Sequence, residues 1–272
     1  MILTDFHTHT EFSADSQAPI EEMIETAIKK GLKYYGISEH INYDYDECGL
    51  KFHDQEEIDP DKYFERARFL QEKYKKDITL LVGAEFGFND SENCKNRYLK
   101  FYEKYSPDYV VNGVHTCLNE ECYFPEFSKN REKRYAYGEY FKCVLESIDA
   151  PYHYDIVAHI GYCSRNAVYE DKKIRYAEYS QILDKILTKI IEKDKILEVN
   201  TSSRSAGSEF IPDTDILQRY FDLGGRKISF GSDAHFPERI CEKYQLVINA
   251  LKEIGFTCLT IPLFNEHVKI EI

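Results

Sequence analysis

The sequence predicts an α/β protein whose mostly parallel sheet closes into a barrel. Short runs rich in β-branched and aromatic residues alternate with amphipathic helical segments, which is the pattern of repeated strand–helix–strand units. Seven or eight such units in a chain of 272 residues are typical of a barrel that folds as one domain. An open, doubly wound sheet stays the alternative, because periodicity does not reveal closure. No repeat or linker marks a boundary, so we expect residues 1–272 to form a single domain.

The predicted strands are short runs with high β-propensity: Ile2–Phe6, Tyr34–Ser38, Ile78–Phe86, Tyr109–Val114, Asp155–His159, Lys195–Asn200, Lys227–Gly231 and Phe256–Ile261. Between the first two, the apolar residues at 20, 23, 24, 27 and 28 follow helical spacing, with Pro19 suited to the first turn and Gly31 to the C-terminal cap. A second helix is predicted to begin at Asp59-Pro60, and a third contains the apolar positions of residues 182–190.

Charge and hydropathy exclude several classes of protein. Lys and Arg total 35 against 48 Asp and Glu, so the formal net charge is −13, and we expect no nucleic-acid partner. No apolar run approaches the roughly 18 residues of a membrane span. The first residues, Met1 to Asp5, lack the basic and apolar regions of a signal peptide. We therefore expect a cytoplasmic protein without a membrane partner, and its eight cysteines, which form no C-x-x-C pair, are expected to be reduced.

Imidazole and carboxyl groups recur where the predicted strands end. His7 and His9 close the first strand, and because side chains alternate along a strand, both point the same way. The other groups at strand ends, or in the loop just after one, are Asp15, His40, Glu85, His115, His159, Asp233 and His235. In a parallel barrel all carboxyl ends of the strands face one side, so these nine groups are expected to meet there.

A cluster of histidines and carboxylates without cysteine suits Zn²⁺, Mn²⁺ or Fe, and nine ligands exceed what one or two ions need. A lone buried histidine is more often a core residue, but the repetition of H-x-H and D-x-H at strand ends favours a multinuclear site. His53, His153 and His267 do not share this position, and we assign them surface or local structural roles. Glu39 and the acidic residues at 44, 46 and 47 could bind a cationic substrate; a solvated loop face is the preferred interpretation.

At these residues the sequence resembles the polymerase and histidinol phosphatase (PHP) superfamily, and within it the histidinol-phosphate phosphatases. The stretches that carry the resemblance are D-F-H-T-H-T, G-I-S-E-H, G-A-E-F, V-N-G-V-H, D-I-V-A-H-I, L-E-V-N-T-S-S-R and F-G-S-D-A-H. The resemblance runs from Asp5 to about His235 and implies a distorted (β/α)7 barrel with three divalent metal ions. It places His7, His9, Glu85 and Asp233 on one ion, Glu85, His115 and His159 on a second, and Asp15, His40 and His235 on the third. Some relatives have histidine at the position of Asp15, a difference that could change the preferred metal.

The resemblance implies hydrolysis of L-histidinol phosphate to L-histidinol and phosphate in histidine biosynthesis. Arg165, shortly after His159, and Arg204, after the sixth predicted strand, are the candidate phosphate-binding and catalytic arginines, because a guanidinium fork matches phosphate. Asp233 is a further catalytic candidate: either the Asp233/His235 pair or a metal-bound water could protonate the leaving group. The alternative functions are a PHP phosphoesterase acting on nucleotides or phosphotyrosine, and a non-catalytic metal-binding PHP module.

Overall fold

A parallel sheet of seven strands forms the centre of the protein, in the order β1-β2-β3-β4-β7-β8-β9. The computed structural model describes residues 3–51, 58–203, 208–264 and 266–272. The strands are β1 (Leu3–Asp5), β2 (Leu32–Ile41), β3 (Thr79–Gly87), β4 (Val110–Gly113), β7 (Ile156–Val157), β8 (Ile196–Asn200) and β9 (Ile228–Gly231). The amide of Phe6 donates to the carbonyl of Phe230 at 3.2 Å, which brings the first and last strands together. The barrel is therefore nearly closed, as predicted, and the open sheet is wrong.

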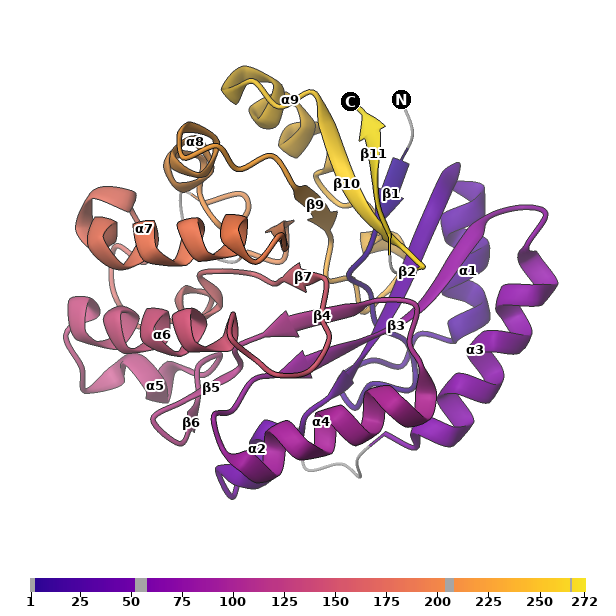
Figure 1. Cartoon of the computed structure of the whole chain (residues 1–272), viewed down its shortest axis with the longest axis horizontal. Helices are drawn as coiled ribbons and strands as arrows, with labels where there is room; N and C mark the ends of the chain where they lie inside the picture. The colour runs from indigo at the N-terminus through magenta and orange to yellow at the C-terminus, as the bar shows by residue number, and fades with distance from the viewer. Residues whose placement is uncertain (1–2, 52–57, 204–207, 265) are drawn as a thin grey trace.

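Helices surround the barrel, with α1, α3 and α4 on one side and α6, α7 and α8 on the other (Figure 1). The helices are α1 (Ile20–Lys29), α2 (Tyr43–Glu47), α3 (Pro60–Tyr74), α4 (Glu92–Tyr105), α5 (Pro125–Lys129), α6 (Lys133–Ser147), α7 (Tyr176–Glu192), α8 (Thr214–Asp222) and α9 (Tyr244–Ile254), with 3₁₀ turns η1 (Tyr162–Ser164) and η2 (Pro237–Arg239). A short hairpin, β5 (Thr116–Cys117) and β6 (Glu120–Glu121), follows β4.

Local sequence explains where the helices begin and end. Helix α1 buries the predicted apolar face, and Gly31 follows its last turn at φ +82°, a conformation that glycine adopts without strain. Helix α3 begins at Pro60, as predicted, because the carboxylate of Asp59 accepts a hydrogen bond from the amide of Lys62 at 3.2 Å. Helix α7 contains the apolar positions predicted for the third helix, among them buried Ile186.

The last predicted strand exists but does not join the barrel. β10 (Cys258–Leu263) pairs antiparallel with β11 (Glu266–Glu271). Ile261 and Ile270 of this hairpin pack in one buried cluster with Phe6 and Tyr109 of the barrel interior. His267 Nε2 lies 3.6 Å from the carboxylate of Asp155, which immediately precedes β7. The hairpin therefore covers the amino-terminal end of the barrel, and the carboxyl ends of the strands remain for polar groups.

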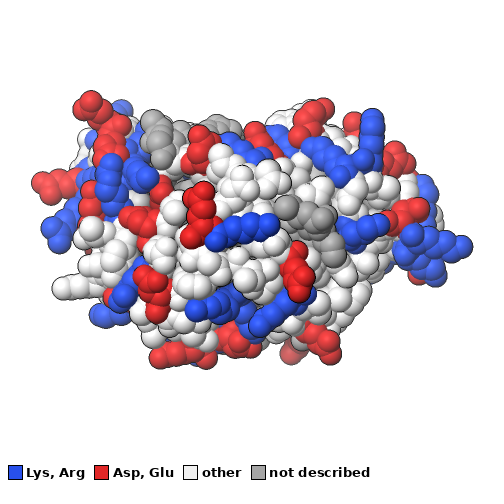
Figure 2. Space-filling view, turned by 90° about the horizontal axis from the view of Figure 1, so that it is seen from above, with Lys and Arg blue, Asp and Glu red and all other residues white. Residues whose placement is uncertain are grey.

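The distribution of charged side chains on the surface agrees with the acid excess of the sequence. On the face shown in Figure 2, basic and acidic side chains are interspersed, and no basic patch stands out. None of the helices in the described residues is long and apolar enough to cross a membrane.

Candidate metal centre

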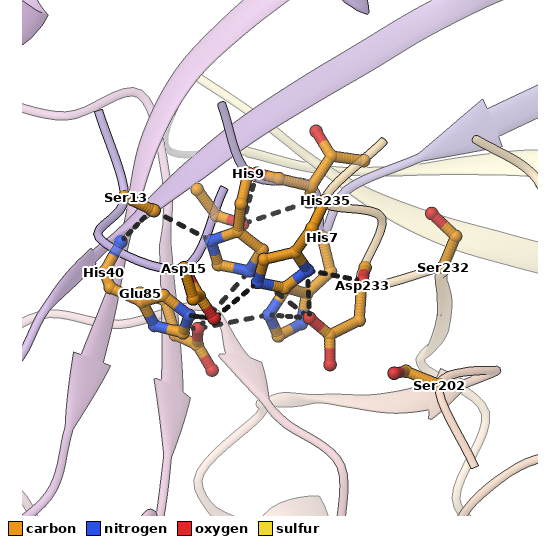
Figure 3. A network of polar contacts seen from close by, with 12 residues as sticks. His7, His9, Ser13, Asp15, His40, Glu85, Ser202, Ser232, Asp233 and His235 are labelled. Atoms are coloured by element: carbon orange, nitrogen blue, oxygen red, sulfur yellow. Dashed lines mark hydrogen bonds and ion pairs between the residues drawn. The ribbon is translucent and has the colours of Figure 1, made fainter. Parts of the chain in front are cut away.

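All nine predicted metal ligands lie at the carboxyl ends of the barrel strands. Figure 3 shows His7, His9, Asp15, His40, Glu85, Asp233 and His235 gathered around one point. His40 of β2 and Glu85 of β3 are paired in the register of the two strands, so the sheet itself places their side chains together. The other seven come from segments that follow a strand: His7, His9 and Asp15 after β1, His115 after β4, His159 after β7, and Asp233 and His235 after β9. Parallel strands thus gather residues that are up to 228 positions apart, from His7 to His235.

Glu85 lies at the middle of the cluster, and its two oxygens face different histidines. Oε2 lies 3.2 Å from Nε2 of His7 and 3.6 Å from Nε2 of His9. Oε1 lies 3.0 Å from Nε2 of His115 and 2.8 Å from Nε2 of His159. Nδ1 of His40 also lies 2.9 Å from Oε2. A carboxylate in this position can bridge two cations, since its two oxygens face different imidazoles.

A third group of side chains lies beside the first two. Oδ2 of Asp15 lies 2.8 Å from Nε2 of His235 and 3.6 Å from Nε2 of His40. The imidazole of His9 stacks on both of these rings, with centroids 4.1 Å from His40 and 4.3 Å from His235. Oδ1 of Asp233 lies 3.4 Å from Nε2 of His9. The nine side chains therefore form one continuous cluster.

The cluster fits divalent metal ions. His7 Nε2, His9 Nε2 and Glu85 Oε2 are buried, yet none of these atoms has a hydrogen-bond partner. Buried polar atoms without partners are destabilising, and coordination to a cation is one way to satisfy them. The donor atoms of three trios, His7/His9/Glu85, His40/Glu85/His115 and His9/His40/His235, lie within 4.8 Å of one another.

Electrostatics keeps the carboxylates of the cluster ionised. Burial would raise the pKa of Glu85, but His7, His115 and His40 together hold that pKa well below its ordinary value. Burial would likewise raise the pKa of Asp233, but the charges of Arg165 and His7 outweigh the effect of burial. The pKa of Asp233 is therefore also well below its ordinary value. Burial, with His40 and His235 nearby, lowers the pKa of His9 to about 3, so its imidazole is neutral and can donate an electron pair.

Two residues of the cluster have unusual backbone conformations. Asp233 has a φ of 54° and His159 a φ of 25°, in a region that residues other than glycine rarely adopt. Such strain persists where the surroundings hold it, and here the amide of Asp233 donates to the carbonyl of His7 at 2.8 Å. The strained backbone is therefore fixed by hydrogen bonding to the strand end that carries the H-x-H pair.

A second layer of buried polar residues, which was not predicted from the sequence, supports the cluster. Glu198 contacts Nδ1 of His7, and Ser13 lies 3.3 Å from Nδ1 of His9. Ser13 in turn donates to Glu39, which is fully buried. The solvated loop face expected for Glu39 is therefore wrong, because its carboxylate accepts hydrogen bonds from Ser13 and Thr10.

The acidic residues after Glu39 divide into buried and exposed ones. Asp44 is fully buried and accepts a hydrogen bond from the hydroxyl of Thr116 at 3.1 Å, so the solvated interpretation is wrong for this residue as well. Asp46 is exposed and forms an ion pair with Arg97 at 2.5 Å, which agrees with the predicted solvated loop face. A charge cluster in sequence therefore separates in space once α2 forms.

Of the two predicted arginines, Arg165 lies within the cluster. Its guanidinium is buried and donates from Nη2 to Oδ2 of Asp233 at 2.7 Å and to Oδ1 of Asn200 at 2.9 Å. Arg204 lies outside the described residues. Ser202, two residues before it, contributes to the wall of the pocket over the cluster.

The remaining histidines lie away from the cluster or outside the described chain. His153 and His267 both contact the carboxylate of Asp155, at 3.3 and 3.6 Å, at the opposite end of the barrel. They have local structural roles there, as predicted from the sequence. His53 lies outside the described residues.

A pocket of about 200 Å³ opens over the cluster. Seven of the nine predicted ligands, all except His7 and His9, contribute to its wall, as does Arg165. Its outer wall contains one further carboxylate, Glu121, and the aromatic rings of Tyr123, Tyr162 and Phe236. The cluster is thus accessible to a small molecule that carries both charged and aromatic groups.

Comparison with known proteins places this arrangement in a family. A model of the PHP domain matches residues 5–202. The probable histidinol-phosphatase of Clostridium acetobutylicum is 34% identical over 265 residues, covering 96% of each chain. The histidinol-phosphatase of Lactococcus lactis is 29% identical, covering 93% of this chain and 91% of that protein.

Solved structures show the same fold. The crystal structure of histidinol phosphate phosphatase from Lactococcus lactis, complexed with zinc, L-histidinol and phosphate, matches with a TM-score of 0.85, 27% identity and 98% coverage of both chains. The putative histidinol phosphatase from Listeria monocytogenes matches in fold with a TM-score of 0.76 at 20% identity, covering 90% of this chain and 99% of that one.

Proposed function

The chain belongs to the PHP domain family, and from this premise we propose that it is a metal-dependent phosphatase that hydrolyses L-histidinol phosphate to L-histidinol and phosphate. One observation carries the proposal: nearly the whole chain matches a histidinol phosphate phosphatase whose structure holds zinc, L-histidinol and phosphate. The buried cluster of imidazoles and carboxylates supplies the chemistry that such a reaction needs. The reaction belongs to histidine biosynthesis, and we propose the cytoplasm as its location.

We propose that the nine clustered residues hold three divalent ions, of zinc, manganese or iron. Glu85 would bridge two of them, since its Oε2 faces His7 and His9 while its Oε1 faces His115 and His159. Asp15, His40 and His235 would hold the third. Bound divalent ions act as Lewis acids toward phosphate oxygens and lower the pKa of a coordinated water.

The residues of the chain itself would orient the substrate. Nη2 of Arg165 is engaged by Asp233 and Asn200, while its buried Nε has no hydrogen-bond partner and remains available to a phosphate oxygen. We propose Arg165 and Arg204 as the phosphate-binding residues, with Asp233 as a catalytic residue that Arg165 keeps ionised. Glu121 and the aromatic side chains of the outer wall suit a substrate that carries an ammonium and an imidazole group.

A panel of phosphate monoesters tests the substrate. L-histidinol phosphate, a nucleoside monophosphate, phosphotyrosine and p-nitrophenyl phosphate are compared by kcat/KM on metal-loaded protein. We expect L-histidinol phosphate to exceed the others by at least about 100-fold, because charged and hydrogen-bonding groups left unpaired by the wrong substrate discriminate strongly. Equal turnover of a nucleotide or of phosphotyrosine would favour the broader phosphoesterase alternative.

A variant at Asp233 controls for contaminating phosphatases and tests the non-catalytic alternative. Asp233→Asn should abolish turnover while the circular dichroism spectrum stays that of the parent protein. If the parent protein binds metal stoichiometrically and hydrolyses none of the four esters, the chain is a metal-binding module and the proposed activity is wrong.

A further inference from the structure

Glu198 of β8 makes hydrogen bonds to two of the proposed metal ligands at once. It is about 1% exposed and lies beneath the cluster. Its Oε1 lies 2.6 Å from Nδ1 of His7, and its Oε2 accepts the backbone amide of His159 at 2.7 Å. The side-chain amide of Asn200 also donates to Oε2, at 3.1 Å. Both carboxylate oxygens are therefore occupied by groups that belong to, or adjoin, the site.

The contact with His7 determines which ring nitrogen faces the cluster. A carboxylate only accepts hydrogen bonds, so Nδ1 of His7 must carry the proton. When the ring is neutral, as metal binding requires, Nε2 carries the lone pair and faces Glu85 Oε2, which lies 3.2 Å away. A second carboxylate that holds the distal nitrogen of a ligating histidine fixes both the tautomer and the ring orientation.

The contact with His159 acts on the backbone and not on the ring. His159 has a φ of 25°, and its amide points at Glu198 instead of at a neighbouring strand. Its Nε2 lies 2.8 Å from the other oxygen of Glu85, Oε1. Glu198 therefore joins His7, on one side of Glu85, to His159, on the other side.

Gly231 leaves the space that this carboxylate occupies. A Cβ atom at Gly231 would lie 2.2 Å from Oε1 of Glu198 and 2.7 Å from Cβ of His7, closer than real atoms approach. The backbone of Gly231 does not need a positive φ, so the absence of a side chain serves the close packing of Glu198 and His7 alone.

We propose that Glu198 is a positioning residue that couples two of the three metal ions, those held by His7 and by His159, and has no such contact with the ligands of the third. The inference deepens the proposed function and rests on the trinuclear site stated there. Asp15, His40 and His235, which would hold the third ion, donate no hydrogen bond to Glu198 among the described contacts.

The test is a titration of metal-free protein with Zn²⁺ in competition with a chelating dye. Glu198→Gln keeps the side-chain volume but has one acceptor oxygen instead of two. Its NH2 group would therefore face an N–H donor, either Nδ1 of His7 or the amide of His159, and one of the two hydrogen bonds would be lost. We expect two of the three ions to bind about 10- to 100-fold more weakly, as replacement of such supporting residues commonly produces. The third ion should keep the affinity that it has in the parent protein.

Two further variants make the result specific. Glu120→Gln removes a surface carboxylate that pairs with Arg131, so it matches the change of charge and should alter no metal affinity. Gly231→Ala should reproduce the loss of the same two ions, because the added methyl group displaces the Glu198 carboxylate and crowds Cβ of His7 while keeping both side chains. Raising the Zn²⁺ concentration should restore turnover in Glu198→Gln, which a general loss of structure would prevent.

The outcomes separate this inference from the proposed function. Retention of all three affinities in Glu198→Gln would overturn it, and so would equal weakening of all three ions. Should Glu198→Gln fail to fold without metal, Gly231→Ala decides by the same two criteria. Loss of the two ions in a protein that does not hydrolyse L-histidinol phosphate would support the coupling and refute only the substrate.

Discussion

Replacement of Arg165 tests whether one buried guanidinium serves both the proposed metal cluster and the substrate phosphate. Arg165 is 5% exposed, and its Nη2 lies 2.7 Å from Asp233 and 2.9 Å from Asn200. Its buried Nε has no hydrogen-bond partner. One nitrogen of the side chain therefore binds Asp233 and Asn200, and Nε is the donor that we propose for a phosphate oxygen.

Arg165→Ala should change two quantities, the free energy of unfolding and kcat/KM. Loss of one partner from a buried ion pair leaves Asp233 without its counter-charge, which typically destabilises a protein by about 3–5 kcal/mol. Loss of a donor to a phosphate oxygen in the transition state should lower kcat/KM by about 100- to 1000-fold. Arg165→Lys keeps the charge but not the fork, so it should recover much of the stability and little of the activity.

The assay compares kcat/KM for L-histidinol phosphate with the midpoint of urea unfolding, at equal metal content, in the parent protein and both variants. Stability that recovers in Arg165→Lys while kcat/KM stays at least about tenfold low would agree with the two roles. Normal kcat/KM in Arg165→Ala refutes the phosphate contact, and leaves Arg165 a purely structural partner of Asp233.

Three other substitutions test separate parts of the account. Gly36→Ala places a Cβ 2.4 Å from the hydroxyl of Tyr109 inside the barrel, so the free energy of unfolding should fall by about 1–3 kcal/mol, and an unchanged urea midpoint would contradict the packing. Burial raises the pKa of Asp44 from 3.8 to about 6, so the stability that this group contributes is complete below pH 3.8 and is lost as the pH rises through 6. Asp44→Asn stays neutral and should gain about 1–3 kcal/mol at about pH 8 but little at about pH 4 in thermal unfolding; equal effects at both pH values contradict it. Arg204→Ala should lower kcat/KM at least about tenfold, chiefly through weaker phosphate binding, and an unchanged kcat/KM excludes that role.

The convergence of the metal-binding side chains could be predicted because it depends on local rules. His7 and His9 share one face by the alternation of a strand, and parallel strands bring their carboxyl ends to one side whatever their separation in sequence. The register that pairs His40 with Glu85 adds detail to this arrangement without changing it. The order of strands and helices predicted a parallel sheet, but closure into a barrel did not follow from periodicity, and the (β/α)7 barrel was implied by the family resemblance.

The supporting residues could not be predicted, because they depend on contacts between distant segments. Glu198 and His7 are 191 residues apart, and only closure of the barrel brings them together. The one available signal was a carboxylate within the apolar run I-L-E-V-N of β8, where burial without a partner would be destabilising. Glu39 carries the same signal in G-I-S-E-H, and the loop that follows obscured it.

The final predicted strand shows that a strand can be predicted from the sequence while its pairing partner cannot. Its β-propensity was sufficient to predict a strand at 256–261, but propensity does not specify the partner. The structure pairs this strand with β11 in antiparallel fashion, and Ile261 and Ile270 then complete the apolar interior at the amino-terminal end of the barrel. A seventh parallel strand, β9, already approaches β1 and leaves no edge for an eighth.

Metal removal and return tests the central claim most directly. The purified protein is stripped with a chelator, its metal content is measured, and turnover of L-histidinol phosphate is followed as Zn²⁺ or Mn²⁺ is added back. Turnover should be absent from the stripped protein and should return with added metal, reaching its maximum near about three ions per chain. Full turnover by protein that contains no metal would contradict the account.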